Sequence, residues 1–245
     1  MHARCAGFTP RDTLRHTMKG GPIFAADTFQ FFEELGQNNR KPWMDENRNR
    51  YKALIVERFR ELLDRLAPVA RALNPGFTIS GRTGENFSRI NRDIRFAADK
   101  TPYRTQMYLF FRETGGEAGQ LYAGLSVDVV TAGFRIYSDG KGSPLMQLGR
   151  PRGMEHGAWL EQQKKRLGRK YESYWYSSEK GEWTKHDGWP LKPEEWKRLQ
   201  AWVVRRKFPT PAATRARFER DVAKIFSDVY PLFLFTSSPD WKPQL

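Results

Sequence analysis

Residues 86–105, NFSRINRDIRFAADKTPYRT, form a denser run of polar and charged side chains than a purely structural role obviously requires. If the first half is extended, alternate side chains point to opposite faces. The polar set that then projects together is Arg89, Asn91, Asp93 and Arg95. The apolar set expected to face the core is Ile90, Ile94 and Phe96. Arg92 falls on the apolar face, so it must be paired, sit at a strand end or mark a turn.

The second half of this stretch adds Asp99, Lys100, Tyr103 and Arg104. Pro102 fixes its own φ and biases the residue before it towards an extended conformation. We therefore expect a rigid loop here that leads into an apolar strand.

The run R-I-N-R-D-x-R-F-x-x-D-K-x-P-Y-R-T, residues 89–105, resembles the hallmark of an uncharacterised bacterial and fungal family, domain of unknown function 2461. An upstream element, Asn38-Asn39-Arg40-Lys41-Pro42-Trp43, is similar to that family's N-N-x-K-x-W element and is followed by Tyr51. The resemblance extends from about residue 29 to about residue 235. It implies an α+β domain in the cytoplasm and brings no assigned activity. The chain departs from the family pattern in its basic N-terminal extension and at Ala97, where a serine is usual.

Hydrophobic periodicity independently predicts an α+β fold, with a central, mainly antiparallel sheet flanked by N-terminal and C-terminal helices. Strands are expected at 106–113, 120–130 and 133–138, with turns at 115–116, 132–133 and 139–140. Helices are expected at 27–36, 42–66 and 155–172, from about 192, and from Pro211 onward. We expect residues 23–245 to form one domain whose sheet is built mainly from residues 77–138. Residues 1–22 carry no sustained periodicity and are expected to be a disordered basic extension.

The composition indicates a basic, aromatic-rich globular protein, with a net charge of +14 and 8 Trp, 9 Tyr and 17 Phe. The positive charge gathers in residues 1–22, 81–112 and 151–210. Such a balance raises the local concentration of polyanions and makes a nucleic-acid partner possible. The single cysteine, Cys5, cannot form an intrachain disulfide, and no secretory signal or long apolar span is visible. We therefore expect a cytoplasmic protein with no membrane partner.

Several classes of site find little support in the sequence. The histidines and the lone cysteine show no metal-ligand spacing, so no metal site is predicted. Asp93 and Asp99 could hold Mg²⁺ against a ligand phosphate, but two carboxylates alone are weak evidence for such a site. No phosphate-binding glycine loop and no nucleophile elbow is present, so no other cofactor is expected.

Three hypotheses remain for the function of the chain. The first is a pocket for a small anionic ligand, including phosphorylated ones, because the motif has five cations and two acids and arginine suits bidentate recognition. The second is a structural ion-pair network, Arg89 or Arg95 with Asp93 and Lys100 with Asp99, that needs no ligand. The third is nucleic-acid binding by a basic, aromatic-rich surface that uses the cations at 164–170 and the aromatic residues at 171–183.

The first hypothesis assigns the ligand-binding residues as Asn39, Lys41, Trp43, Arg89, Asn91, Arg95, Lys100 and Tyr103. If the pocket is catalytic, Asp93 or Asp99 would be the general base and Lys100 or Tyr103 the acid or oxyanion donor. The upstream cluster also has a structural interpretation, in which the asparagines cap and turn the chain and Trp43 anchors a helix in the core. The sequence does not choose a reaction or an oligomeric state.

Overall fold

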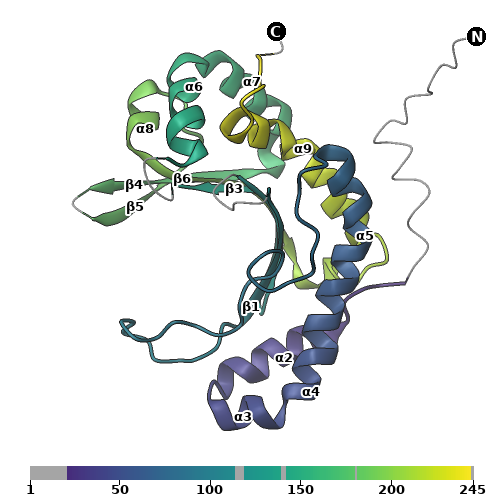
Figure 1. Cartoon of the computed structure of the whole chain (residues 1–245). Helices are drawn as coiled ribbons and strands as arrows, with labels where there is room; N and C mark the ends of the chain where they lie inside the picture. The colour runs from purple at the N-terminus through teal and green to yellow at the C-terminus, as the bar shows by residue number, and fades with distance from the viewer. Residues whose placement is uncertain (1–20, 114–118, 139–141, 180, 244–245) are drawn as a thin grey trace, which may run out of the picture.

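The computed structural model describes residues 21–113, 119–138, 142–179 and 181–243. Within them, six strands form one antiparallel sheet in the order β1-β2-β3-β6-β4-β5. The strands are β1 (Gln106–Phe111), β2 (Gln120–Ser126), β3 (Val129–Tyr137), β4 (Glu172–Glu179), β5 (Glu182–Asp187) and β6 (Leu199–Pro209). Figure 1 shows the sheet curving between the β4–β5 hairpin and the lower end of β1. The predicted α+β class is confirmed.

The helices begin with α2 (Ala26–Gln37), α3 (Lys41–Glu46), α4 (Arg48–Tyr51) and α5 (Glu57–Leu73). A π-helical turn, Lys52–Val56, joins α4 to α5. After β3 the chain forms a π turn, Leu145–Gly149, then α6 (Arg150–Glu155), α7 (Gly157–Leu167) and a 3-10 turn, Gly168–Lys170. The remaining helices are α8 (Pro193–Arg198), a 3-10 turn, Thr210–Ala212, and α9 (Phe218–Ser237). No helix in these ranges is long and apolar enough to cross a membrane.

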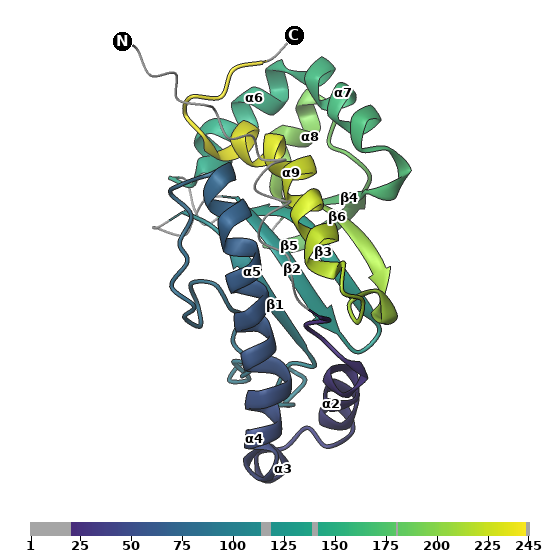
Figure 2. The same ribbon diagram turned by 90° about the vertical axis from the view of Figure 1, so that its right-hand side faces the viewer.

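One face of the sheet, which we call the covered face, packs against α5 and α9. The two helices lie side by side in front of the sheet in Figure 2. Helix α5 presents an apolar stripe at helical spacing, Phe59, Leu62, Leu63, Leu66 and Ala70, all buried. Strand residues on the same side, such as Leu121, Phe134 and Trp202, are also buried. This layer of apolar and aromatic side chains forms the main core.

The opposite face, which we call the open face, carries the alternate strand positions. Its residues include Tyr108, Phe110, Tyr122, Arg135, Tyr174 and Arg205. Phe110 and Tyr122, together with Val203 on the same face, form a small apolar cluster separate from the main core. No helix of the described ranges covers this face in Figure 1.

Several expected boundaries differ from the structure. The turn placed at residues 132–133 is wrong, because β3 runs through both positions and the chain reverses at residues 127–128. A Cβ on Gly133 would lie 2.1 Å from the backbone oxygen of Val204, so glycine here permits close approach of β3 and β6 rather than a turn. The sheet is not built mainly from residues 77–138, since β4, β5 and β6 come from beyond residue 138. The expected extension at 1–22, apart from residues 21 and 22, and the expected turns at 115–116 and 139–140 lie outside the described residues.

Gly153 gives a first testable prediction. It lies in α6, where glycine to alanine normally stabilises a helix by about 1 kcal/mol. A Cβ at this position would lie 1.9 Å from the ring of Trp196, which is fully buried and donates its indole N–H to Pro190 O at 2.7 Å. We therefore expect Gly153→Ala to lower the free energy of unfolding by about 1–3 kcal/mol, the usual cost of overpacking.

Urea denaturation followed by circular dichroism measures this effect, and Gly36→Ala in α2 is its matched control. A Cβ on Gly36 would meet the side chain of Thr105 at 3.5 Å, an ordinary contact. The control should be neutral or slightly stabilising. A Gly153→Ala protein as stable as the wild type would show that Trp196 can move aside at little cost.

Candidate functional site

The hallmark folds into a narrow projection that we call the arm, residues 90–104. Its two sides are joined by backbone hydrogen bonds from Arg92 N to Pro102 O and from Arg104 N to Ile90 O, both 2.8 Å. An antiparallel bridge between Asn91 and Tyr103 lies between them. In Figure 1 the arm extends from the lower end of the sheet, below the β4–β5 hairpin.

Arg92 holds the two sides of the arm together through its side chain. Its guanidinium forms an ion pair with Asp99 and donates to the hydroxyl of Thr101 and, at 3.2 Å, to the carbonyl of Thr101. The backbone N–H of Thr101 donates to Asp99 at 2.9 Å. The sequence required Arg92 to be paired, sit at a strand end or mark a turn, and pairing is what the structure shows.

The tip of the arm contains a second ion pair. Arg95 donates to both oxygens of Asp93, at 3.0 and 2.7 Å, and both side chains are largely exposed. Lys100 donates to the carbonyl oxygens of Ile94, at 3.0 Å, and Arg95, at 3.4 Å, rather than to Asp99. Part of the hallmark is therefore an ion-pair clamp, with a pairing that differs from the expected one for Asp99.

The expected burial of Phe96 is wrong, since its side chain is 95% exposed. The extended alternation ends before Phe96, because the backbone bends at residues 95 and 96. Ile90 is buried as expected, and Ile94 is half-buried.

The upstream cluster reaches the arm through Asn39. Its side-chain amide donates to Tyr103 O at 2.9 Å, and its side-chain oxygen accepts from Tyr103 N at 3.0 Å. The other two residues of this cluster that were assigned to ligand binding, Lys41 and Trp43, have different partners. Lys41 forms an ion pair with Asp45 at 2.6 Å, and the ring of Trp43 packs on Phe31 with centroids 5.7 Å apart.

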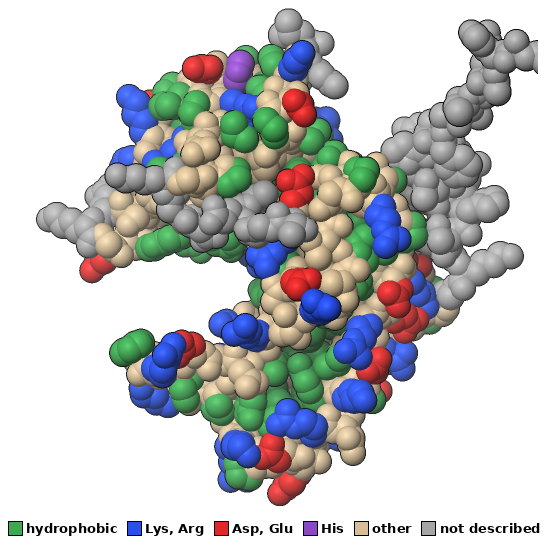
Figure 3. Space-filling view, viewed as in Figure 1, with side chains coloured by type: hydrophobic (Ala, Val, Ile, Leu, Met, Phe, Trp, Pro, Cys, Tyr) green, Lys and Arg blue, Asp and Glu red, His purple; other side chains and the backbone are tan. Residues whose placement is uncertain are grey.

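Between the arm and the open face lies a depression of about 840 Å³. It is lined by residues of the arm and its entry, and by Tyr108, Phe110 and Arg135 of the sheet. Figure 3 shows the molecule hollowed on this side, between the arm below and the β4–β5 end above. Five arginines line the depression, Arg89, Arg92, Arg95, Arg104 and Arg135, against one acid, Asp93.

A smaller depression, of about 460 Å³, lies on the other side of the arm's base and includes Asn39, Arg92, Asp99, Tyr103 and Arg104. Arg92 and Arg104 line both depressions. Lys41, Trp43 and Lys100 line neither, and Tyr103 is buried. Of the eight residues assigned to ligand binding, Arg89, Asn91 and Arg95 line the larger depression.

Arg135, which sequence reasoning missed, occupies the centre of the open face. Its guanidinium lies 4.8 Å from the ring centroid of Tyr122, 5.1 Å from that of Tyr108 and 5.7 Å from that of Phe110. Its Nε–H donates to Gln120 at 3.0 Å. Only its alternate position on an expected strand could have indicated that Arg135 faces the same side as Tyr137.

The two arm carboxylates are poor general bases in this arrangement. The backbone N–H of Thr101 and the guanidinium of Arg92 lower the pKa of Asp99 to about 2. Hydrogen bonds from Arg95 likewise lower the pKa of Asp93. A carboxylate whose pKa lies far below neutrality accepts a proton weakly at pH 7. The arrangement is therefore suited to holding an anion more than to moving protons through Asp93 or Asp99.

The described residues contain no group of three or more His, Cys, Asp or Glu side chains that could hold a metal ion. One pair of potentially reactive groups that the sequence did not indicate is Ser177 and His186, whose side chains lie 2.8 Å apart across β4 and β5. Ser177 is buried, and the His186 ring stacks on Trp175 with centroids 4.1 Å apart. This contact therefore fastens the hairpin to the core and leaves the hydroxyl inaccessible to a substrate.

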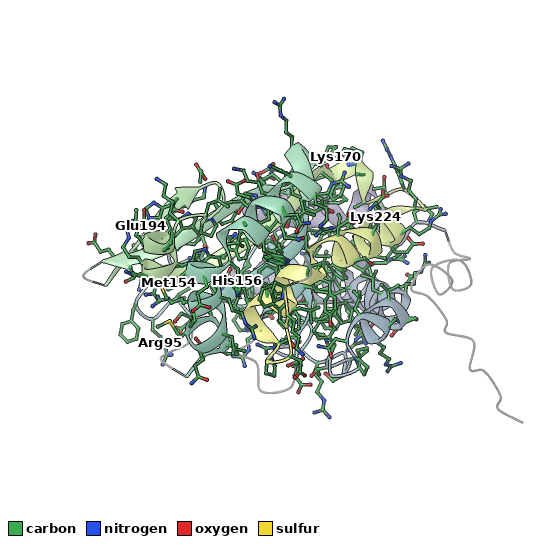
Figure 4. The ribbon with its side chains drawn as sticks, turned by 90° about the horizontal axis from the view of Figure 1, so that it is seen from above. Arg95, Met154, His156, Lys170, Glu194 and Lys224 are labelled. Atoms are coloured by element: carbon green, nitrogen blue, oxygen red, sulfur yellow. The ribbon has the colours of Figure 1, made fainter. Side chains whose placement is uncertain are left out.

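The basic cluster at 164–170 lies apart from the arm. Lys164, Lys165, Arg166, Arg169 and Lys170 are exposed on α7 and the turn after it. Figure 4 labels Lys170 and Arg95 on different sides of the molecule. A depression of about 900 Å³ between α7 and the end of α9 includes Arg166 and Lys242 but also Asp240, so it lacks the arginine excess of the arm.

Comparison with known families gives one match over most of the chain. The model of the family described as conserved hypothetical protein (DUF2461) matches residues 27–235, which include nearly all of α2, the arm, all six strands and most of α9. No curated protein matches the chain.

Proposed function

For this chain, which belongs to the DUF2461 family of conserved hypothetical proteins, we propose that the arm and the open face bind a small anionic ligand. One observation carries the proposal. In the part of the chain that the structure describes, the depression between the arm and the open face is lined by five guanidinium groups and one carboxylate. Two of the five are neutralised within the arm, Arg92 by Asp99 and Arg95 by Asp93.

The other three arginines form the excess. Arg89, Arg104 and Arg135 have no carboxylate within 4.0 Å among the described residues. Like charges gathered around one hollow repel each other, and the repulsion is relieved when an anion enters. Guanidinium groups also present paired N–H donors that match phosphate and carboxylate oxygens.

The shape of the depression is compatible with a small molecule. Its volume of about 840 Å³ lies in the usual range for ligand sites, about 300–1,000 Å³. Tyr108 and Phe110 supply an apolar floor, and Arg89, Arg104 and Arg135 supply the polar groups. The expected ligand is therefore an anion with some apolar surface, and phosphorylated metabolites fit this description.

In this proposal, some of the residues predicted from sequence contact the ligand directly and others act indirectly. Arg89, Asn91 and Arg95 contact the ligand, and Arg104 and Arg135 join them. Asn39 acts indirectly, because its amide positions the Tyr103 backbone at the base of the arm. The structural ion-pair hypothesis accounts for Arg92 and Arg95 but leaves Arg89, Arg104 and Arg135 without a function.

A thermal-shift screen with phosphate, pyrophosphate, nucleoside monophosphates and citrate tests the proposal. A ligand that binds only the folded state at one hundred times its Kd stabilises it by about 2.7 kcal/mol. For a chain of this size, that corresponds to a rise in Tm of about 5–10 °C. We expect at least one anion to produce such a rise in the wild type and little or none in Arg89→Ala/Arg104→Ala.

The matched control is Lys165→Ala/Lys170→Ala, which removes the same charge from exposed positions on the α7 side. It should keep the full shift. The proposal is wrong if no anion stabilises the wild type, or if both double variants lose the shift to the same extent.

A further inference from the structure

We infer that the open face of the sheet is a binding surface for single-stranded nucleic acid, with a backbone phosphate in the depression beside the arm. This inference rests on the proposed function, because the same arginines would hold that phosphate. It goes further by assigning a ligand class to the rest of the open face, on β4, β5 and β6, which contribute no residue to the lining of the depression.

Exposed aromatic side chains point to a ligand with flat rings. The exposed large hydrophobic side chains of the described residues are Phe96 at 95%, Trp183 at 52% and Tyr137 at 37%. Phe96 lies on the arm, Trp183 on β5 and Tyr137 on β3, so all three belong to the elements around the hollow in Figure 3. Large apolar groups exposed together mark interaction sites more often than scattered single ones do.

On the β4–β5 hairpin, aromatic rings form a continuous series. The ring centroids of Tyr174 and Tyr176 are 5.9 Å apart, and those of Tyr176 and Trp183 are 5.8 Å apart. Two cations lie over Tyr174, Lys185 at 4.8 Å and Arg205 at 5.0 Å from its centroid. Stacking rings interleaved with cations are what a single strand requires, because bases stack on the rings while phosphates meet the cations.

The strand register joins this series to the depression. Val203 pairs with Arg135 of β3 on one side and with Tyr174 of β4 on the other, so the three side chains lie in one row on one face. Two strand spacings separate Arg135 from Tyr174, a distance of about 10 Å. Arg135, with the rings around it, and Tyr174, with its cations, are therefore neighbouring centres of one surface.

Charge complementarity favours a polyanion. On the strands beyond the depression, Arg205 and Lys207 share the single carboxylate of Glu172, and Lys185 pairs with Asp187. With Arg89, Arg104 and Arg135, the surface has a clear excess of cations. A duplex would present phosphates but keep its base faces stacked away from the aromatic side chains, so the rings select a single strand.

Fluorescence anisotropy with labelled oligonucleotides tests the inference. We expect the wild-type chain to bind a 12-nucleotide single strand at least tenfold more tightly than a 12-base-pair duplex or a nucleoside monophosphate. Binding should weaken steeply as salt rises, because each neutralised phosphate releases counterions. Trp183→Ala should weaken single-strand binding by about tenfold, within the range for loss of one stacked base. Trp183→Phe, which keeps a ring, should retain most of the affinity.

Two variants that each lose four positive charges test whether the oligonucleotide binds a defined surface or is attracted to any basic part of the protein. Arg89→Ala/Arg104→Ala/Lys185→Ala/Lys207→Ala removes four cations around the open face. Lys164→Ala/Lys165→Ala/Arg169→Ala/Lys170→Ala removes four on the α7 side. We expect the first set to reduce the salt dependence and the affinity strongly, and the second to leave both close to wild type.

The outcomes distinguish the two proposals. If small anions stabilise the chain but the single strand binds no better than a duplex or a monophosphate, the proposed function survives and the inference is overturned. Equal losses in the two charge variants, or an unchanged affinity in Trp183→Ala, overturn the inference as well. If neither anions nor oligonucleotides bind, both proposals are overturned. Because Trp183 is exposed, its variants remain informative even if a fourfold variant does not fold.

Discussion

Replacing Asn86 by alanine should lower the free energy of unfolding by about 3–5 kcal/mol, since a buried polar group left without its partner costs about 1–3 kcal/mol. The Asn86 side chain is fully buried. Its oxygen accepts from Ser80 N at 2.9 Å and Gly81 N at 3.0 Å, and its amide donates to Thr78 O at 2.7 Å and Phe110 O at 3.1 Å. The Ser80 hydroxyl also donates to this oxygen at 3.4 Å. Asn86→Ala removes all five hydrogen bonds and leaves a cavity.

Urea denaturation measures this loss, and two variants control it. Asn91→Ala changes the same side chain at an exposed position of the arm, so it should stay within about 0.5 kcal/mol of wild type. Asn86→Asp keeps the accepted hydrogen bonds and loses the two donated ones, so it should also destabilise. Equal stabilities for Asn86→Ala and Asn91→Ala would show that water replaces the lost partners.

Asn86 also anchors the segment that leads into the hallmark. Its hydrogen bonds tie the segment 78–81 to β1, immediately before the chain enters the arm. The first residue of the dense polar run is therefore structural, whereas Phe87, Ser88, Arg89 and several residues of the arm line the depression. The dense polar run therefore combines three roles: Asn86 anchors it, the ion pairs of the arm clamp it, and other residues form a candidate binding surface. A count of charges in the sequence does not show which residue has which role.

The sequence predicted the fold class, the family and the start of two strands correctly because these depend on local patterns. Strands β1 and β2 begin at residues 106 and 120, as expected from apolar alternation and flanking glycines. It failed at Gly133, because a glycine inside a strand and a glycine in a turn look alike until the partner strand is known. Only the approach of Val204 to this position shows which role it has.

The candidate site was predictable only where the sequence neighbours are also neighbours in space. The arm lies within one short stretch, so Arg89, Asn91 and Arg95 could be named. Arg135 could not, because it reaches the depression only through the β1–β2–β3 pairing. The sequence pattern predicts a buried Phe96 because the alternation of inward and outward side chains is assumed to continue to residue 96. The backbone bends at residues 95 and 96, and no preceding residue type indicates this bend.

The same sheet explains why the aromatic residues at 171–183 could not be assigned to core or surface from sequence. Strand alternation sends Tyr171 and Trp175 to the covered face, where both are buried, and Tyr174 and Tyr176 to the open face. Core packing therefore describes Tyr171 and Trp175, and a surface available for stacking describes Tyr174 and Tyr176. The distinction can be tested with two tryptophans, one on each face.

Trp202→Ala should lower the free energy of unfolding by about 3–5 kcal/mol, the usual range for removal of a buried tryptophan. Trp202 is fully buried, and its ring lies 5.4 Å from those of Trp189 and Trp196 and 5.8 Å from that of Phe134. Its indole N–H donates to the hydroxyl of Ser173 at 2.9 Å. The variant therefore loses both apolar contact and a buried hydrogen bond.

Trp183→Ala removes the same side chain from β5, where it is 52% exposed. It should cost clearly less than Trp202→Ala, because about half of the Trp183 side chain stays in contact with water in the folded chain, whereas Trp202 is fully buried. Urea denaturation compares the stabilities of the two variants directly. In an oligonucleotide binding assay at a temperature where both variants are folded, the proposed surface requires the opposite result: Trp183→Ala should lose more affinity than Trp202→Ala. A Trp183→Ala protein that loses as much stability as Trp202→Ala would place Trp183 in the structural core and remove the main aromatic contact from the proposed binding surface.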